Sequence, residues 1–293
     1  MNDYTTADWK PSGVLINYNL VRGAELKAIY EYIEAQGETS VQQVVDSFAP
    51  KRDGERKEDN ARQCVDFLNS IDMVNRPDSG QPIELQNESI LPDLGFEARV
   101  LFHLREQAEP RDYFSRIYDV SLREADRSIP LDSLLPDVRR EFEREFDWNL
   151  TKLRMWRSLM VQLGLISETD NRGLILSPCR ALIFDVLTAY DRRNESNDLI
   201  DLMEWVQEHF FEVFDSKTGT PSAHPAFADV LQNMESDDIL TLRGMADAQN
   251  EVKLPATRQN PTDRSIKSFS VDVEDGRDPY QYPLEQSTLG VQR

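Results

Sequence analysis

Basic side chains occur without any acidic neighbour at one place in this acid-rich sequence, the segment 148–167. At the 100° steps of a helix, the polar residues of this segment separate from its apolar ones and form one outward face with two flanks. That face and its flanks carry Thr151, Lys152, Arg154, Arg157, Ser158 and Gln162. Guanidinium and ammonium groups in this arrangement can bind phosphates, and Arg can also pair bidentately with a guanine edge. The segment therefore predicts an anion-binding helix.

The same helix could instead be buried against its own protein or a partner. Its basic residues would then pair with acidic residues of the preceding segment, namely Glu141, Glu143 and Glu145. Both interpretations stay open at the level of sequence.

A second candidate face lies in the segment 59–71, where Arg62 and Asn69 point away from the apolar residues. Asp66 shares that face and would repel phosphate. The preceding loop, residues 51–59, holds four basic and four acidic residues. A solvated polar face is therefore the simpler interpretation of this segment.

Motifs of common enzyme classes are not visible. The 12 glycines form no phosphate-binding loop and no nucleophile elbow. Asp237 or Asp238, followed by Glu251 and Lys253, resembles the metal site of restriction-like nucleases, in which carboxylates hold Mg²⁺. The same acid-x-lysine tripeptide also occurs at residues 25–27, within a predicted helix. We therefore expect a protein that is not an enzyme, with a metal-dependent nuclease as a weak alternative.

Cysteines and histidines are few and widely spaced. They are Cys64, Cys179, His103, His209 and His224. This spacing does not fit a zinc site, and we expect no metal or cofactor. No signal peptide is visible at residues 1–10 and no apolar run approaches 18 residues, so we expect a cytoplasmic protein with reduced thiols that does not span a membrane.

Three predicted helices and a hairpin follow one another near the start of the chain. Apolar spacing predicts helices at residues 24–36, 40–48 and 59–71, and short strands at 73–76 and 83–85. This order resembles the winged-helix family of helix-turn-helix domains, as does the passage of residues 67–74 from a helix into a strand. The resemblance implies that the third helix enters the DNA major groove.

A second region ends in the same way. Residues 159–166 pass from a helix through Gly164 into a strand, and a polar turn leads to a second strand near residues 174–176. Upstream, residues 131–142 and 150–163 suit the second and third helices of a winged helix. Residues 96–107 suit its first helix, and 113–124 then form an extra helix that departs from the family.

Further amphipathic helices are expected after Pro178, at residues 181–192, 199–214, 227–234 and 239–248. The apolar stripe of the second one could form a homodimer or bind a protein partner, or it could belong to the core. It consists of Leu199, Leu202, Trp205, Val206 and Phe210. Only two weak strands, 252–255 and 266–273, are expected beyond it, because the sequence there turns polar.

Charge is the strongest feature of the composition. The formal net charge is -20, and the 33 basic residues comprise 25 Arg and 8 Lys. An acidic surface poor in Lys resembles the proteins of halophilic archaea, in which molar salt screens self-repulsion. An ordinary acidic bacterial protein is the alternative. Such a charge opposes binding to nucleic acid, so a local basic face matters more than the total.

The expected fold is mainly α with small β-hairpins. We expect an N-terminal arm at residues 1–23, tandem winged-helix modules at 24–92 and 93–178, a helical region at 179–250 and a largely disordered tail at 251–293. The resemblance implies a regulatory protein that binds double-stranded DNA or associates with it. The alternative is a non-enzymatic interaction scaffold of a multi-subunit complex, because winged helices are also used to bind proteins.

Overall fold

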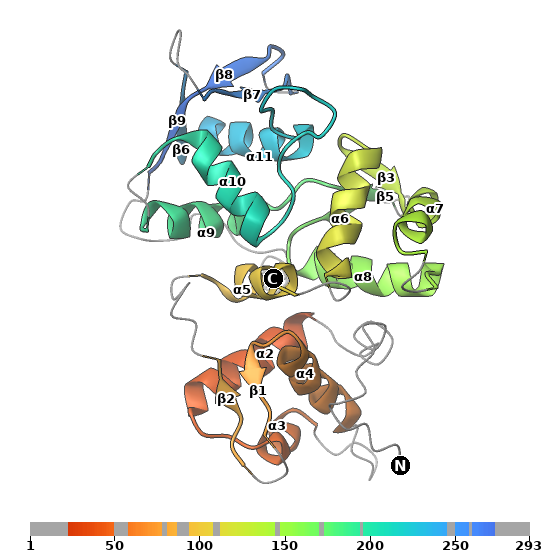
Figure 1. The fold of residues 1–293 in the computed structure, drawn as a ribbon. Helices are drawn as coiled ribbons and strands as arrows, with labels where there is room; N and C mark the ends of the chain where they lie inside the picture. Colours follow the sequence, from red (N-terminus) through yellow and green to blue (C-terminus); the bar gives the residue numbers. More distant parts are fainter. Residues whose placement is uncertain are drawn as a thin grey trace, which may run out of the picture.

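The computed structural model describes the chain in ten segments. They are residues 23–49, 58–77, 81–86, 94–107, 112–143, 147–169, 173–193, 196–244, 250–257 and 260–272. The described part is mainly helical, with a few small antiparallel strand pairs, as the sequence predicts (Figure 1). The predicted N-terminal arm lies outside the described residues.

Unit 1 spans residues 23–86. Its elements are α2 (Gly23–Gln36), α3 (Val41–Phe48), α4 (Glu58–Ser70), β1 (Val74–Asn75) and β2 (Glu84–Leu85). Ser40 begins α3 with a capping box in which Ser40 and Gln43 satisfy each other's backbone amides. Strand β2 pairs with β1 on one side, and the neighbouring Ile83 bridges Thr39 on the other. Thr39, β2 and β1 thus form a small antiparallel sheet, in which the β2 segment lies in the middle.

Unit 2, residues 113–175, has the same order of elements. They are α6 (Tyr113–Glu124), β3 (Ser128–Pro130), α7 (Leu131–Glu141), α8 (Leu150–Gln162), β4 (Ser167–Glu168) and β5 (Gly173–Ile175). The sheet order is β3-β5-β4, and both pairs are antiparallel. The helix before the first strand is therefore α6. Helix α5 (Phe96–Arg105), which was expected in that position, lies outside the unit.

Unit 3, residues 180–271, repeats the order a third time. Its elements are α9 (Arg180–Asp191), α10 (Leu199–His209), α11 (Pro225–Ser236), β6 (Leu240–Arg243) and β9 (Ser268–Val271). Strand β9 pairs with β6 and, through Ser268, bridges Asp198 at the start of α10. A second hairpin, β7 (Val252–Leu254) and β8 (Arg264–Ile266), is inserted between β6 and β9.

One expectation for this region is wrong. The helix predicted over residues 239–248 is strand β6 at Leu240–Arg243, where alternate residues are buried, and 245–249 lie outside the described residues. Within the predicted tail, 251–293, the strands expected at 252–255 and 266–273 overlap β7 and β9, and Val252, Leu254 and Ile266 are buried in the core. Residues 273–293 lie outside the described residues.

The same turn leads from the third helix to the next strand in all three units. Asp72, Gly164 and Asp238 occupy it with φ of 60°, 75° and 59°. Each of them donates its amide three residues back, and the next residue donates five back, over 3.0 to 3.2 Å. This is the Schellman ending of a helix, which requires a left-handed residue. It directs each third helix into the strand that follows it.

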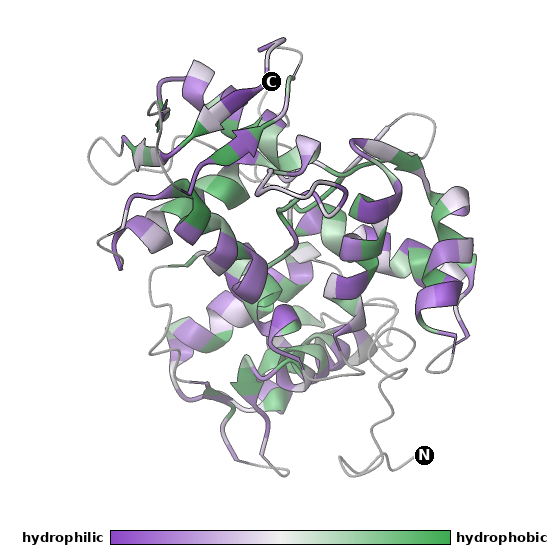
Figure 2. Ribbon diagram, turned by 45° about the horizontal axis from the view of Figure 1, so that its top comes forward, coloured by the Kyte–Doolittle hydropathy of each residue, from purple (hydrophilic) through white to green (hydrophobic). Residues whose placement is uncertain are grey.

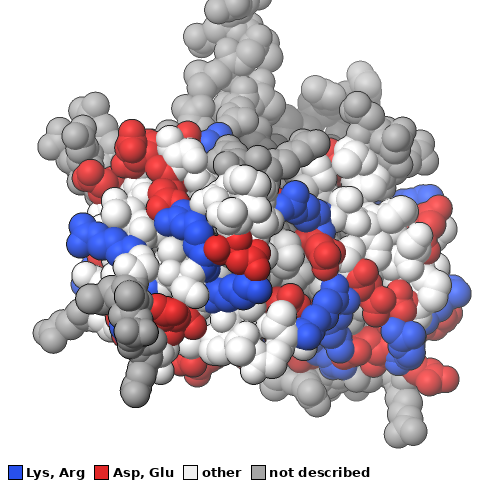
Figure 3. All heavy atoms as spheres, turned by 90° about the horizontal axis from the view of Figure 1, so that it is seen from above, with Lys and Arg blue, Asp and Glu red and all other residues white. Residues whose placement is uncertain are grey.

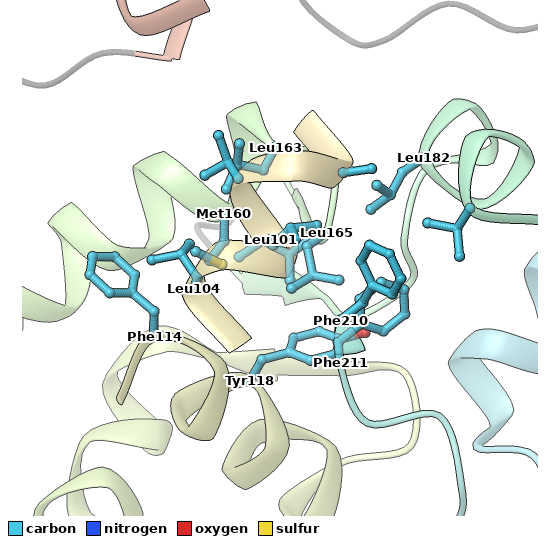
Figure 4. Packing of buried hydrophobic residues seen from close by; sticks show 14 of the residues in the cluster. Leu101, Leu104, Phe114, Tyr118, Met160, Leu163, Leu165, Leu182, Phe210 and Phe211 are labelled. Carbon is cyan, nitrogen blue, oxygen red and sulfur yellow. The ribbon is translucent and has the colours of Figure 1, made fainter. Parts of the chain in front are cut away.

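Helix α5 joins the three units. Its residues Leu101 and Leu104 point toward Met160 and Leu163 of unit 2 in the packing shown in Figure 4. Figure 2 shows that described helices carry hydrophobic residues on one side and hydrophilic residues on the other. On its other side α5 holds unit 1, where Lys27 forms an ion pair of 3.2 Å with the buried Glu97.

Candidate nucleic-acid interface

Helix α8 is fixed by its buried face. Asn149 caps its first turn by accepting the amide of Lys152 over 3.1 Å. The indole of Trp156, which is fully buried, donates to the carbonyl of Phe114 over 2.9 Å. Anchored in this way, the helix turns Arg154 toward solvent.

The exposed residues of α8 are those that the helical spacing predicts. Thr151, Arg154 and Ser158 are all exposed, and Ser158 donates its hydroxyl to the carbonyl of Arg154 over 3.0 Å. The guanidinium of Arg154 forms no ion pair with any residue that the structure describes. The N-terminal and middle turns of α8 therefore offer a cation to an external anion.

The two flanking cations are less available. Arg157 Nε lies 3.0 Å from Glu168 Oε1 of strand β4, and its side chain is 18% exposed. Lys152 donates its ammonium to the carbonyl of Asp147. The glutamate that pairs with Arg157 follows the helix, whereas the acids expected to pair with its basic residues precede it. One of these, Glu141, pairs with Arg116 and Arg123.

The C-terminal end of α8 contacts unit 1. Gly23 donates its amide to Gln162 Oε1, and a Cβ at Gly23 would lie 2.5 Å from that oxygen. The glycine permits this close approach of α2 and α8. Gln162 therefore belongs to the contact between units 1 and 2.

The predicted polar face of α4 is engaged within unit 1. Arg62 Nη2 donates to Gln42 on α3 over 3.1 Å, and Asn69 Oδ1 accepts the backbone amide of Arg76 over 2.8 Å. Arg76 also forms an ion pair with Asp66. These contacts join α4 to its neighbouring helix and hairpin.

Helix α11, the third helix of unit 3, is covered. Its buried Gln232 accepts the hydroxyl of Thr257 over 2.5 Å and donates to the carbonyl of Pro255 over 3.3 Å. Its acids Asp229 and Glu235 pair with Arg127 and Arg264. The upper face of the molecule, where unit 3 lies, mixes acidic and basic side chains (Figure 3). This helix therefore presents no cationic face.

A polar pocket of about 250 Å³ lies between unit 2 and the segment that precedes α11. Its lining includes Asp119, Arg123, Glu212 and His224. Burial, and then the nearby charge of Asp119, raise the pKa of Glu212 to about 7. Burial also raises the pKa of Asp119 and lowers that of His224. Sequence reasoning missed this cluster, although an acid inside the apolar run 210–214 could have indicated it.

The nuclease residues are not brought together as a metal site. Asp237 forms an ion pair with Arg180, and Lys253 forms one of 2.7 Å with Asp263. Within the part of the chain that the structure describes, no group of three His, Cys, Asp or Glu residues could hold a metal ion.

The predicted dimerisation stripe on α10 lies in the core of its own chain. Leu199, Leu202, Val206 and Phe210 are at most 1% exposed, and Trp205 packs against Tyr190 at 5.3 Å between ring centroids. Four of the five stripe residues are therefore buried in the core, whereas Trp205 is partly exposed.

None of the described helices has the length and apolar character needed to cross a membrane. No protein-family model, curated protein or solved structure matches the chain.

Proposed function

We propose that the chain is a DNA-binding or DNA-associated regulatory protein made of three winged-helix units. The observation that supports the fold assignment is the threefold recurrence of helix, extended residue, two helices and two strands. In each case the last strand lies between the other two extended segments. This topology is the one expected of a winged helix, in which the third helix docks in the major groove.

Unit 2 is the proposed DNA-contacting unit. Its third helix, α8, exposes Thr151, Arg154 and Ser158. Arg154 would read a guanine edge or hold a phosphate, while the two hydroxyl residues would contact phosphates. Lys152, in the first turn of the helix, would add a phosphate contact at the positive end of the helix dipole.

The net charge of -20 shapes the expected binding. It opposes non-specific attraction to DNA, so the affinity has to come from the local cationic face. We propose a cytoplasmic protein adapted to high salt, in which screening reduces repulsion between the acidic surface and the phosphates.

Arg154→Ala tests the proposal. Binding of a DNA duplex is titrated at several salt concentrations, and removal of one phosphate contact lowers the slope of log K against log salt by about one unit. Arg193→Ala, at an exposed position after α9, is the matched control for loss of one positive charge. Equal slopes for the two variants would exclude α8 as the contact surface.

A protein-interaction scaffold is the second candidate. It is supported by unit 3, where the insert between β6 and β9 covers α11, and by unit 1, where Arg62 and Asn69 bond within their own unit. Under this alternative the wild-type chain binds no DNA duplex at any salt concentration, and Arg154→Ala instead weakens its association with a protein partner.

A further inference from the structure

Glu168, on strand β4, holds one of the basic residues of α8. Glu168 Oε1 lies 3.0 Å from Arg157 Nε, and the side chains are 40% and 18% exposed. Although Arg157 Nε is buried, no acceptor is aligned with it as a hydrogen bond. The contact is therefore Coulombic rather than directional, and partial exposure of the glutamate leaves it screened by solvent. Such a pair can exchange its anion for another one.

A DNA phosphate and the Glu168 carboxylate are chemically similar partners for Arg157. Both are anions whose oxygens match the fork of a guanidinium. Arg157 lies one turn from the exposed Arg154 on the same helix, three residues apart, so a phosphate near Arg154 approaches the Arg157–Glu168 pair as well.

We propose that Glu168 is an affinity-limiting residue of the α8 surface, which occupies Arg157 in place of a DNA phosphate. This inference rests on the proposed DNA-binding function. Glu168 lowers affinity in two ways: it neutralises Arg157, and it places a negative charge beside the approaching backbone. Its chemistry makes the DNA phosphodiester the ligand that Glu168 keeps away from Arg157.

Glu168→Gln tests the inference, because glutamine keeps the shape of the side chain and removes its charge. A DNA duplex is titrated over a range of salt concentrations with the wild type, Glu168→Gln, Arg157→Ala and the double variant. We expect Glu168→Gln to bind several-fold more tightly at fixed salt and to steepen the salt slope by about one unit, since Arg157 then gains a phosphate. Arg157→Ala alone leaves the slope near that of the wild type, and in the double variant it cancels the gain.

Two controls separate this effect from general charge and from misfolding. Glu208→Gln on α10, where the side chain is 75% exposed, makes the same charge change away from α8. Glu168→Thr, which suits a strand position, is expected to steepen the slope as Glu168→Gln does, so failure of one variant to fold leaves the other.

The outcomes are distinguishable. If Glu168→Gln changes affinity only as much as Glu208→Gln and leaves the slope unchanged, while Arg154→Ala still lowers it, the inference is overturned and the proposed function stands. If the wild-type chain binds no duplex, both are overturned.

Discussion

At the scale of single residues, the most perturbed acid–base groups of the described part lie where units 2 and 3 meet. The carboxyl of Asp119 pairs with Arg105 of α5 over 2.8 Å, and one of its oxygens is buried without a hydrogen-bond partner. The charge of Asp119 raises the pKa of Glu212, whereas the charges of Arg105 and Arg123 lower it. Burial and the proximity of two acids disfavour two full negative charges here, so the pKa of each carboxyl is raised.

Glu212 makes the stability of the fold depend on pH. Its pKa rises from 4.5 in the unfolded reference to about 7, so the folded chain binds a proton that the unfolded chain has already released. The contribution of Glu212 to stability is present below pH 4.5 and is lost as the pH rises to about 7. Asp119 acts in the same direction. His224, whose pKa is lowered, acts in the opposite one.

We therefore expect Glu212→Gln to reduce the loss of thermal stability that the wild type shows between pH 5 and pH 8. The measurement is the unfolding midpoint at constant ionic strength. Glu208→Gln, on the exposed side of α10, serves as the control and should keep the wild-type pH profile. A profile for Glu212→Gln that matches the wild type would contradict the assignment of this proton.

The faces of α8 could be predicted from sequence, but the partner of Arg157 could not. Helical spacing fixes which of its side chains turn outward, and Thr151, Arg154 and Ser158 are exposed as that spacing requires. The Arg157–Glu168 pair depends instead on the position of strand β4 relative to helix α8. That position follows from pairing across the sheet, which local periodicity does not encode.

At the scale of elements, one helix-to-strand turn serves all three units. Left-handed backbone costs a residue with a Cβ about 1–2 kcal/mol, less for Asp, and costs glycine nothing comparable. Units 1 and 3 use Asp72 and Asp238 where unit 2 uses Gly164. The two aspartates therefore carry strain that unit 2 avoids.

Glycine at the turn is expected to stabilise units 1 and 3. Asp72→Gly and Asp238→Gly should each raise the free energy of unfolding by up to about 1 kcal/mol, while Gly164→Ala should lower it by about 1 kcal/mol. Urea unfolding measures the three effects without changing the ionic strength. Destabilisation by both aspartate substitutions would show that their side chains contribute more than the relief of strain.

The same turn explains where prediction from sequence failed. Two of its occurrences, before Val74 and before Ile166, are followed by short strands that the sequence analysis recognised. The third was missed, because Asp238 was not recognised as a left-handed residue and the apolar residues after it also suit a helix. Its partner strand β9 lies beyond the β7–β8 insert, so no local hairpin pattern remained.

At the scale of the whole molecule, the net charge of -20 should make stability depend on salt. Raising NaCl from about 0.1 M to about 2 M shortens the Debye length from about 10 Å to below 3 Å and screens the self-repulsion of the folded chain. We expect the unfolding midpoint to rise by several degrees. KCl should act equally, because the effect is one of ionic strength. A midpoint that is independent of both salts would contradict adaptation to high salt.

The covering of α11 within unit 3 has a consequence for the geometry of recognition. A chain that offers α8 as its contact helix would engage one major-groove segment from one side, and the resulting footprint would be asymmetric. Palindromic operators match proteins in which a two-fold axis relates two identical DNA-binding subunits. With the apolar stripe of α10 enclosed in its own core, this chain would need another surface to create such an axis. Footprinting should therefore give a short, unsymmetrical protected region, unless a partner protein extends it.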